Sequence, residues 1–284
     1  MKYRKNFCRS VSFRLWIVWM AALFVGWIPA RAQRVDTVGV YSPSMDKQVK
    51  NLVILPEGYD ADPARRYPVV YLLHGYNNRY DSWLRKTKPE LPRMATAYGT
   101  IIVCPDGASS WYWDSPKDPS YRYETFVSSE LVKYIDGHYK TIADRKGRAI
   151  TGLSMGGHGA MWNAIRHKDT FGAGGSTSGG VDIRPFPLNW DMSKQLGEFA
   201  YNKKVWDEHT VINQIDKIEN GDLAIIIDCG EADFFLNVNK DLHNRLLARK
   251  INHDFITRPG GHNGKYWNNS SDYQILFFDK FFKK

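Results

Sequence analysis

The chain has 284 residues, of which 43% are hydrophobic and 24% are charged, as in ordinary globular proteins with a sizeable core. Its formal net charge of +9 raises the question of nucleic-acid binding. However, six of the 39 lysines and arginines lie in residues 1–32, which contain no acidic residue, so 33 basic residues face 30 acidic ones in the remainder. This small surplus excludes an extended phosphate-binding surface, and we expect no nucleic-acid partner.

Residues 1–32 have the three parts of a secretory signal peptide. A basic start precedes an apolar run at residues 15–28, and Ala30 and Ala32 fit the small-residue pattern of a cleavage site. The apolar run is shorter than the roughly 20 residues that span a bilayer comfortably. We therefore predict cleavage after Ala32, a secreted or periplasmic protein, and no stable membrane association after cleavage. An uncleaved membrane anchor is the alternative.

Short β-rich segments alternate with helical patterns through residues 33–284. The predicted strands are 50–55, 69–74, 101–105, 148–152 and 223–228, with one more candidate beginning at His253, and the predicted helices are 124–139, 157–167 and 237–250. This alternation predicts a single α/β domain in which helices cover both faces of a mainly parallel sheet. The less regular stretch 181–221, rich in Pro, Asn and Trp, is expected to form a small cap-like insertion over the carboxyl edge of the sheet.

Two cysteines follow the leader, Cys104 and Cys229, and each closes a separate predicted strand. The expected topology does not make these strands neighbours. We therefore predict two buried free thiols, although export would permit a disulfide.

Residues 152–156 read G-L-S-M-G, the only G-x-S-x-G pattern in the chain. The pattern follows a predicted strand and opens a predicted helix. A turn of this kind holds its serine in a strained conformation at the positive end of the helix, and the glycines leave room on both sides. We therefore predict that Ser154 is a nucleophile and not an incidental serine in a glycine-rich turn.

A serine hydroxyl needs a base, and the base needs an orienting carboxylate. Among the later histidines, His262 lies in a glycine turn after the last strand candidate, at the sheet edge where Ser154 is expected. The acid should lie between them in the chain, where Asp228, Glu231 and Asp233 follow one strand. We predict Asp233, which lies beyond a glycine turn and can reach towards the histidine, with Glu231 as the alternative.

The oxyanion of an acyl-transfer intermediate needs two hydrogen-bond donors. The expected donors are the backbone N–H of Met155, directly after the nucleophile, and that of Tyr76, in the loop after the strand at 69–74. Gly75 would let this loop approach closely, and we expect His74 to hold the loop through a side-chain hydrogen bond.

These motifs together resemble the putative-esterase family of α/β-hydrolases, which includes feruloyl, acetylxylan and tributyrin-type esterases, S-formylglutathione hydrolase and mycolyltransferases. The matching stretches are residues 67–75, 152–160, 229–233 and 259–262. The resemblance implies an α/β-hydrolase fold. It also implies that Ser154 is the nucleophile, Asp233 the acid and His262 the base. Tyr76 and Met155 would be the oxyanion donors. Residues 110–116 and 123–125 look most like the feruloyl and tributyrin-type branches.

Aromatic residues near the predicted site indicate which chemical groups the substrate carries. Trp111, Tyr112 and Trp113 follow a strand end and are expected to stack on a sugar or aryl acyl group, although packing is the alternative. Three further tryptophans could border the pocket: Trp190, Trp206 and Trp267.

The sequence contains no H-E-x-x-H motif, no paired Cys/His spacing and no glycine fingerprint for nucleotides, so we expect neither metal nor cofactor. The sequence therefore predicts a secreted serine carboxylesterase for feruloyl or acetyl esters of plant polysaccharide, acting on small-molecule or polysaccharide-linked esters. The alternatives are a broad short-chain (tributyrin-type) esterase and an acyltransferase to an alcohol acceptor. The oligomeric state stays open.

Overall fold

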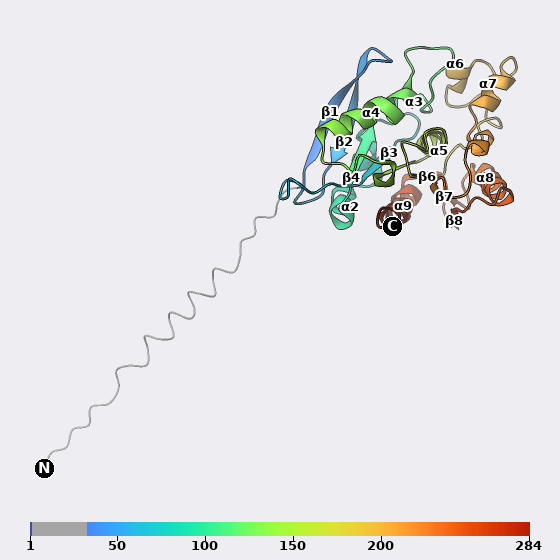
Figure 1. Ribbon diagram of the computed structural model, residues 1–284. Helices are drawn as coiled ribbons and strands as arrows, with labels where there is room; N and C mark the ends of the chain where they lie inside the picture. The colour runs from blue at the N-terminus through green and yellow to red at the C-terminus, as the bar shows by residue number, and fades with distance from the viewer. Residues whose placement is uncertain (2–32) are drawn as a thin grey trace. The chain divides into compact units, whose positions relative to one another are not determined.

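An eight-stranded sheet forms the centre of the computed structural model, which describes Met1 and residues 33–284 (Figure 1). The predicted signal peptide lies outside the described residues. Residues Gln33–Lys284 form one compact unit. No helix in the described part of the chain is long and apolar enough to cross a membrane.

The strand order is β1-β2-β4-β3-β5-β6-β7-β8; the β1–β2 and β2–β4 pairings at one edge are antiparallel, and all the pairings from β4 to β8 are parallel. The strands are β1 (Val35–Ser42), β2 (Lys47–Ile54), β3 (Val69–Leu73), β4 (Ile101–Pro105), β5 (Arg148–Gly152), β6 (Ala173–Thr177), β7 (Ala224–Gly230) and β8 (Asp254–Arg258). The β3 and β5 strands lie at the centre, where their carboxyl ends meet. The predicted mainly parallel α/β sheet is confirmed.

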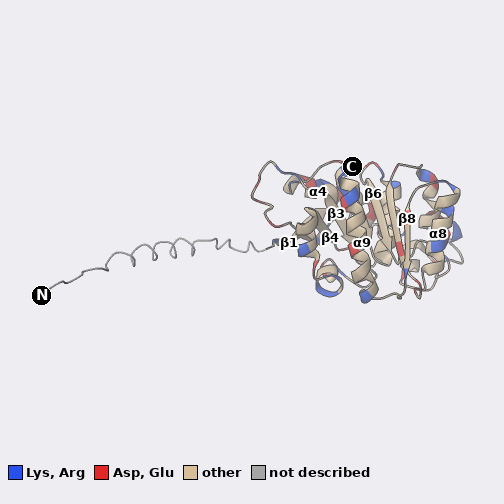
Figure 2. Ribbon diagram, turned by 90° about the horizontal axis from the view of Figure 1, so that it is seen from below, with Lys and Arg blue, Asp and Glu red and all other residues tan. Residues whose placement is uncertain are grey.

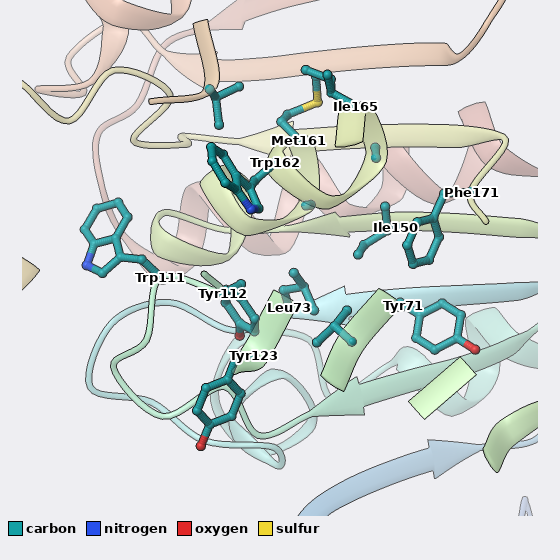
Figure 3. Packing of buried hydrophobic residues seen from close by; sticks show 14 of the residues in the cluster. Tyr71, Leu73, Trp111, Tyr112, Tyr123, Ile150, Met161, Trp162, Ile165 and Phe171 are labelled. Atoms are coloured by element: carbon teal, nitrogen blue, oxygen red, sulfur yellow. The ribbon is translucent and has the colours of Figure 1, made fainter. Parts of the chain in front are cut away.

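Helices cover both faces of this sheet. Alternate residues of β3 divide between two cores, because successive side chains of a strand point to opposite faces. Tyr71 and Leu73 belong to the core that also includes side chains of α4 (Leu131–His138), α5 (Met155–Arg166) and α8 (Leu236–Ala248). Figure 3 shows part of this core, with Ile150 of β5 facing the same layer. Val70 and Leu72 instead pack with α2 (Leu91–Tyr98) and α9 (Gly264–Phe282).

The remaining helical pieces are short. They are η2 (Trp83–Thr87), α3 (Tyr123–Thr125), η3 (Phe126–Glu130), η4 (Arg145–Gly147), α6 (Met192–Leu196), α7 (Lys203–Glu208), η5 (Val211–Asn213) and η6 (Ile215–Lys217). The predicted helix 124–139 is thus built from α3, η3 and α4 in succession.

The cap-like stretch 181–221 contains α6, α7, η5 and η6, between β6 and β7. Its inner side chains belong to the main core, and Trp206 is completely buried with its indole N–H donating to the Gly197 carbonyl at 2.9 Å. The stretch is therefore packed onto the domain through an apolar inner face.

Strand β6 was not predicted, because its sequence AGGST lacks the β-branched and aromatic run that indicates a strand. The reason for its glycines is close packing. A Cβ on Gly175 would lie 2.1 Å from Gln274 Oε1 and 2.8 Å from Thr151 Oγ1, so a side chain here would force its neighbours on α9 and β5 to move. The free, buried Cys104 and Cys229 lie on β4 and β7, as predicted.

Glu124 of α3 is a buried carboxylate held by three donors. They are Trp162 Nε1 at 2.8 Å, Arg166 Nε at 2.7 Å and His167 Nε2 at 2.9 Å. Burial alone raises the pKa of Glu124, but these hydrogen bonds and the Arg166 charge outweigh burial and lower the pKa to about 2. Elsewhere basic and acidic residues are interspersed along the helices (Figure 2).

This pKa predicts a pH-dependent stability. A carboxyl whose pKa is depressed in the folded state stabilises the fold above its unfolded pKa, and this contribution is lost as the pH falls. Between about pH 5 and pH 2 we expect the wild type to lose about 3 kcal/mol of unfolding free energy more than Glu124→Gln. Urea unfolding at a series of pH values measures this, with the exposed Glu198→Gln as control. Parallel pH profiles for wild type and Glu124→Gln would contradict it.

Candidate active site

Ser154 lies at the sharp turn between β5 and α5, at the carboxyl edge of the sheet. Its backbone has φ 56° and ψ −118°, a strained conformation for a residue with a side chain. Its N–H donates to the Thr177 carbonyl at 3.0 Å, which ties the turn to β6. The turn therefore has the geometry that exposes a serine hydroxyl above a sheet.

Glycines make this turn sterically possible. A Cβ on Gly156 would lie 2.3 Å from the Leu73 carbonyl oxygen of β3, and a Cβ on Gly152 would meet the same oxygen at 2.6 Å. On the opposite side, a Cβ on Gly75 would lie 2.6 Å from Leu153 Cδ1. The first turn of α5 and the loop after β3 are thus in direct contact around Ser154.

The structure brings Ser154, His262 and Asp233 together from three different loops. The Ser154 hydroxyl lies 2.9 Å from His262 Nε2, and His262 Nδ1 lies 2.9 Å and 3.1 Å from the two carboxylate oxygens of Asp233. Asp233 is buried, whereas the His262 side chain is 16% exposed. Because ionised Asp233 can only accept, Nδ1 carries the proton and Nε2 is free to accept the serine proton.

The loops that carry the acid and the histidine hold each other. They follow β7 and β8, which are parallel neighbours. Ala232 N–H donates to the Gly260 carbonyl at 2.8 Å, and a Cβ on Gly230 would lie 2.4 Å from that same oxygen. The alternative acid, Glu231, is exposed and contacts β8 only through its backbone N–H, which donates to Arg258.

Asp228, the other nearby carboxylate, does not contact His262 but joins structural elements beneath it. It is completely buried and accepts hydrogen bonds from Tyr266 (2.6 Å), Ser270 (2.8 Å) and Arg258 (2.6 Å). Burial raises its pKa, against the effect of these donors. The cluster fastens α9 to the ends of β7 and β8, beneath the loops that hold Asp233 and His262.

The two backbone N–H groups predicted to bind an oxyanion, those of Met155 and Tyr76, are free to donate to a further acceptor. Met155 is the first residue of α5, and within residues 33–284 neither its N–H nor that of Tyr76 has a hydrogen-bond acceptor. His74 holds the Tyr76 loop as predicted: Nδ1 bonds to the Gly75 carbonyl and Nε2 accepts from Gly107 N–H, each at 2.8 Å. The Tyr76 hydroxyl donates to Asp191 of the insertion at 2.7 Å.

Trp111, Tyr112 and Trp113 lie in the core, contrary to the expectation that they contact substrate. Their exposed fractions are 1%, 0% and 0%, so no ring offers a free face. The Tyr112 hydroxyl donates to the His74 carbonyl at 3.1 Å, and its ring fills the space beside Gly159. The cluster supports the loop after β3 from below, which is the packing alternative considered above.

The aromatic rings nearest the histidine come from elsewhere. Phe234, half exposed, follows Asp233 directly, and its ring centre lies 4.3 Å from that of His262. Trp190 stacks on Phe234 at 5.8 Å, and Trp267 lies edge-on to His262 at 4.9 Å. The two tryptophans were among the expected border residues, whereas Phe234 had no motif to mark it beyond its position beside the acid.

The other histidines and acids do not form a second centre. Burial lowers the pKa of His158 to about 3, so this residue, one turn after Ser154, is a neutral core histidine. In residues 33–284 no three His, Cys, Asp or Glu side chains are grouped so as to hold a metal ion.

The fold and these contacts define an α/β-hydrolase with the site of a serine ester hydrolase. Residues 42–271 match the family described as "Putative esterase", and the chain belongs to this family.

An acetyl esterase of Caldicellulosiruptor saccharolyticus is 25% identical over 81% of this chain and 92% of its own length. An esterase of Mycobacterium tuberculosis is 29% identical over 74% of this chain, which spans about half (51%) of that protein. Among solved structures, a ferulic acid esterase with 28% identity superposes with a TM-score of 0.76, covering 88% of this chain and 98% of that one. The relatives support esterase activity for this chain.

The close contact at Gly156 yields a stability prediction. Gly156→Ala should destabilise the fold by about 3 kcal/mol, because neither the backbone of β3 nor that of α5 can move aside. Gly137→Ala in α4 is the matched control, since its Cβ would meet nothing within 4 Å and should stabilise the helix by up to about 1 kcal/mol. Urea unfolding of both variants tests this, and equal stability for Gly156→Ala and wild type would refute the steric argument.

The positions of the two acids yield a second prediction. Asp233→Asn should lower kcat for a p-nitrophenyl ester by about 10³- to 10⁴-fold, because an amide favours the wrong histidine tautomer. Glu231→Gln, two residues away and exposed, should change kcat by less than about 3-fold, since surface changes have small effects. A severe loss in Glu231→Gln with a mild one in Asp233→Asn would reverse the assignment of the acid.

Proposed function

We propose that the protein hydrolyses carboxylic esters through an acyl-enzyme intermediate on Ser154. The observation that supports this most directly is the chain of hydrogen bonds from the Ser154 hydroxyl through both nitrogens of His262 to buried Asp233. Each of the three has one role in the proposal: nucleophile, base and orienting acid.

In the first step, Ser154 Oγ attacks the ester carbonyl carbon and its proton passes to His262 Nε2. Asp233 stabilises the resulting imidazolium. The carbonyl oxygen becomes an oxyanion that accepts hydrogen bonds from the N–H groups of Met155 and Tyr76. When the intermediate collapses, the bond to the alcohol oxygen breaks, and that oxygen takes the proton from His262.

In the second step, a water molecule gives a proton to His262 Nε2 and attacks the acyl-enzyme carbonyl. The same two N–H groups stabilise the second oxyanion. Collapse breaks the bond to Ser154 Oγ, which recovers its proton from His262, and releases the carboxylic acid. The cycle uses only groups of this chain and water.

For the substrate, we propose feruloyl or acetyl esters of plant polysaccharide. The acetyl esterase and ferulic acid esterase relatives support both acyl groups. The basic start, apolar run and small residues of positions 1–32 support export to the compartment where such polymers occur.

A panel of esters with and without an added alcohol tests the proposal on protein beginning at Gln33. We expect turnover of methyl ferulate or acetylated xylan, a burst of p-nitrophenol from activated esters, and at least about a 10⁴-fold loss of kcat in Ser154→Ala and in His262→Ala with the fold intact.

Other outcomes separate the alternatives. Turnover confined to tributyrin and short p-nitrophenyl esters would indicate a broad short-chain esterase. An ester of the added alcohol as the main product would indicate an acyltransferase. Full activity of Ser154→Ala would overturn the proposed mechanism.

A further inference from the structure

An aromatic surface beside the catalytic histidine is formed by Phe186, Trp190 and Phe234. Trp190 and Phe234 stack with their ring centres 5.8 Å apart and their planes 19° from parallel. Phe186 lies 5.6 Å from Trp190 and 6.3 Å from Phe234. We call these three rings the aromatic face; two come from the insertion and one from the loop that carries Asp233.

The aromatic face is open to solvent, unlike the aromatic cluster beneath it. Phe234 is 50% exposed, and Phe186 and Trp190 are half-buried, whereas Phe235 and Trp111 on the inner side are buried. A contiguous group of apolar rings that reaches the solvent beside a candidate active centre is a candidate ligand-binding surface.

The face is also placed for a group attached to the reacting carbonyl. The Phe234 ring centre lies 4.3 Å from that of His262, whose Nε2 contacts the Ser154 hydroxyl. Phe234 and Ser154 are therefore neighbours of the same imidazole ring. The ring of a cinnamoyl ester lies two carbons beyond its carbonyl, whereas an acetyl group ends one carbon beyond and would leave the face bare.

The backbone holds the face in place before any ligand arrives. Trp190 and Asp191 are consecutive residues with φ of 53° and 55°, a backbone conformation that residues other than glycine rarely adopt. The Asp191 carboxylate accepts the Tyr76 hydroxyl at 2.7 Å, and the Trp190 carbonyl accepts Trp111 Nε1 at 3.4 Å. These bonds fasten the insertion to the loops after β3 and β4. A rigid aromatic surface costs little entropy on binding.

We infer that the aromatic face is the acyl subsite and that it selects esters whose acyl group carries an aromatic ring, of the hydroxycinnamoyl type, over acetyl esters. This inference rests on the proposed function and narrows it. It assigns the acyl contacts to Phe186, Trp190 and Phe234 in place of Trp111, Tyr112 and Trp113.

The test compares kcat/KM for methyl ferulate and methyl acetate, which share the same alcohol and differ only in the acyl group. Phe234→Ala should lower kcat/KM for methyl ferulate about 10-fold, as expected for a lost aromatic contact, and change that for methyl acetate by less than about 2-fold. Trp190→Ala should act in the same direction, and Phe234→Tyr should retain the selectivity. Tyr201→Ala, an 85% exposed aromatic of the same insertion outside the face, is the control and should change neither value.

Each result has one meaning. Equal losses for both esters in Phe234→Ala would show that the ring only supports His262, and unchanged values would show that it contacts no acyl group; either overturns the subsite while leaving the esterase intact. Wild-type protein that turns over neither ester would instead count against the proposed function itself. Circular dichroism of each variant checks that the fold is retained.

Discussion

The contact between the first turn of α5 and the end of β3 is the constraint on which the site depends. Ser154 can take its strained backbone conformation only because Gly152 and Gly156 let α5 begin against the Leu73 carbonyl. This one contact places Ser154 at the carboxyl edge of the sheet and brings the loop with Tyr76 alongside. The proposed nucleophile and oxyanion donors are thus placed by backbone packing and not by flexible side chains.

A second set of contacts delivers the base and the acid to that hydroxyl. Parallel pairing of β7 and β8 puts the two loops side by side, and the glycine backbones of Gly230 and Gly260 touch. Beneath them, buried Asp228 joins both strands to α9 through Arg258 and Tyr266. Replacing Asp228, Arg258 or Tyr266 would leave buried polar partners without hydrogen bonds. Several contacts therefore hold the loops of Asp233 and His262 in position.

Chemistry and selectivity are supplied by different parts of the chain. The triad loops and oxyanion donors all follow strands of the sheet, whereas two of the three rings of the aromatic face belong to the insertion between β6 and β7. The Tyr76–Asp191 hydrogen bond is one of the links between the two parts. A change in the insertion can therefore alter the acyl preference while the reacting groups keep their positions.

The central strands and the residues proposed to react could be predicted from the sequence. Buried parallel strands such as β3 and β4 are apolar runs, and glycines in the sequence mark the bends that hold Ser154 and His262. Features that depend on residues distant in the sequence could be seen only in the structure. Strand β6, with its two glycines, forms by pairing with β5 and β7 on either side. Asp233 rather than Glu231 contacts His262, because the loop after β7 turns the Asp233 side chain inward. Trp113 and Phe234 are both aromatic, but in the structure Trp113 is buried and Phe234 is half exposed. The exposure of a ring depends on the residues that pack over it, and these are brought together only when the insertion packs onto the sheet.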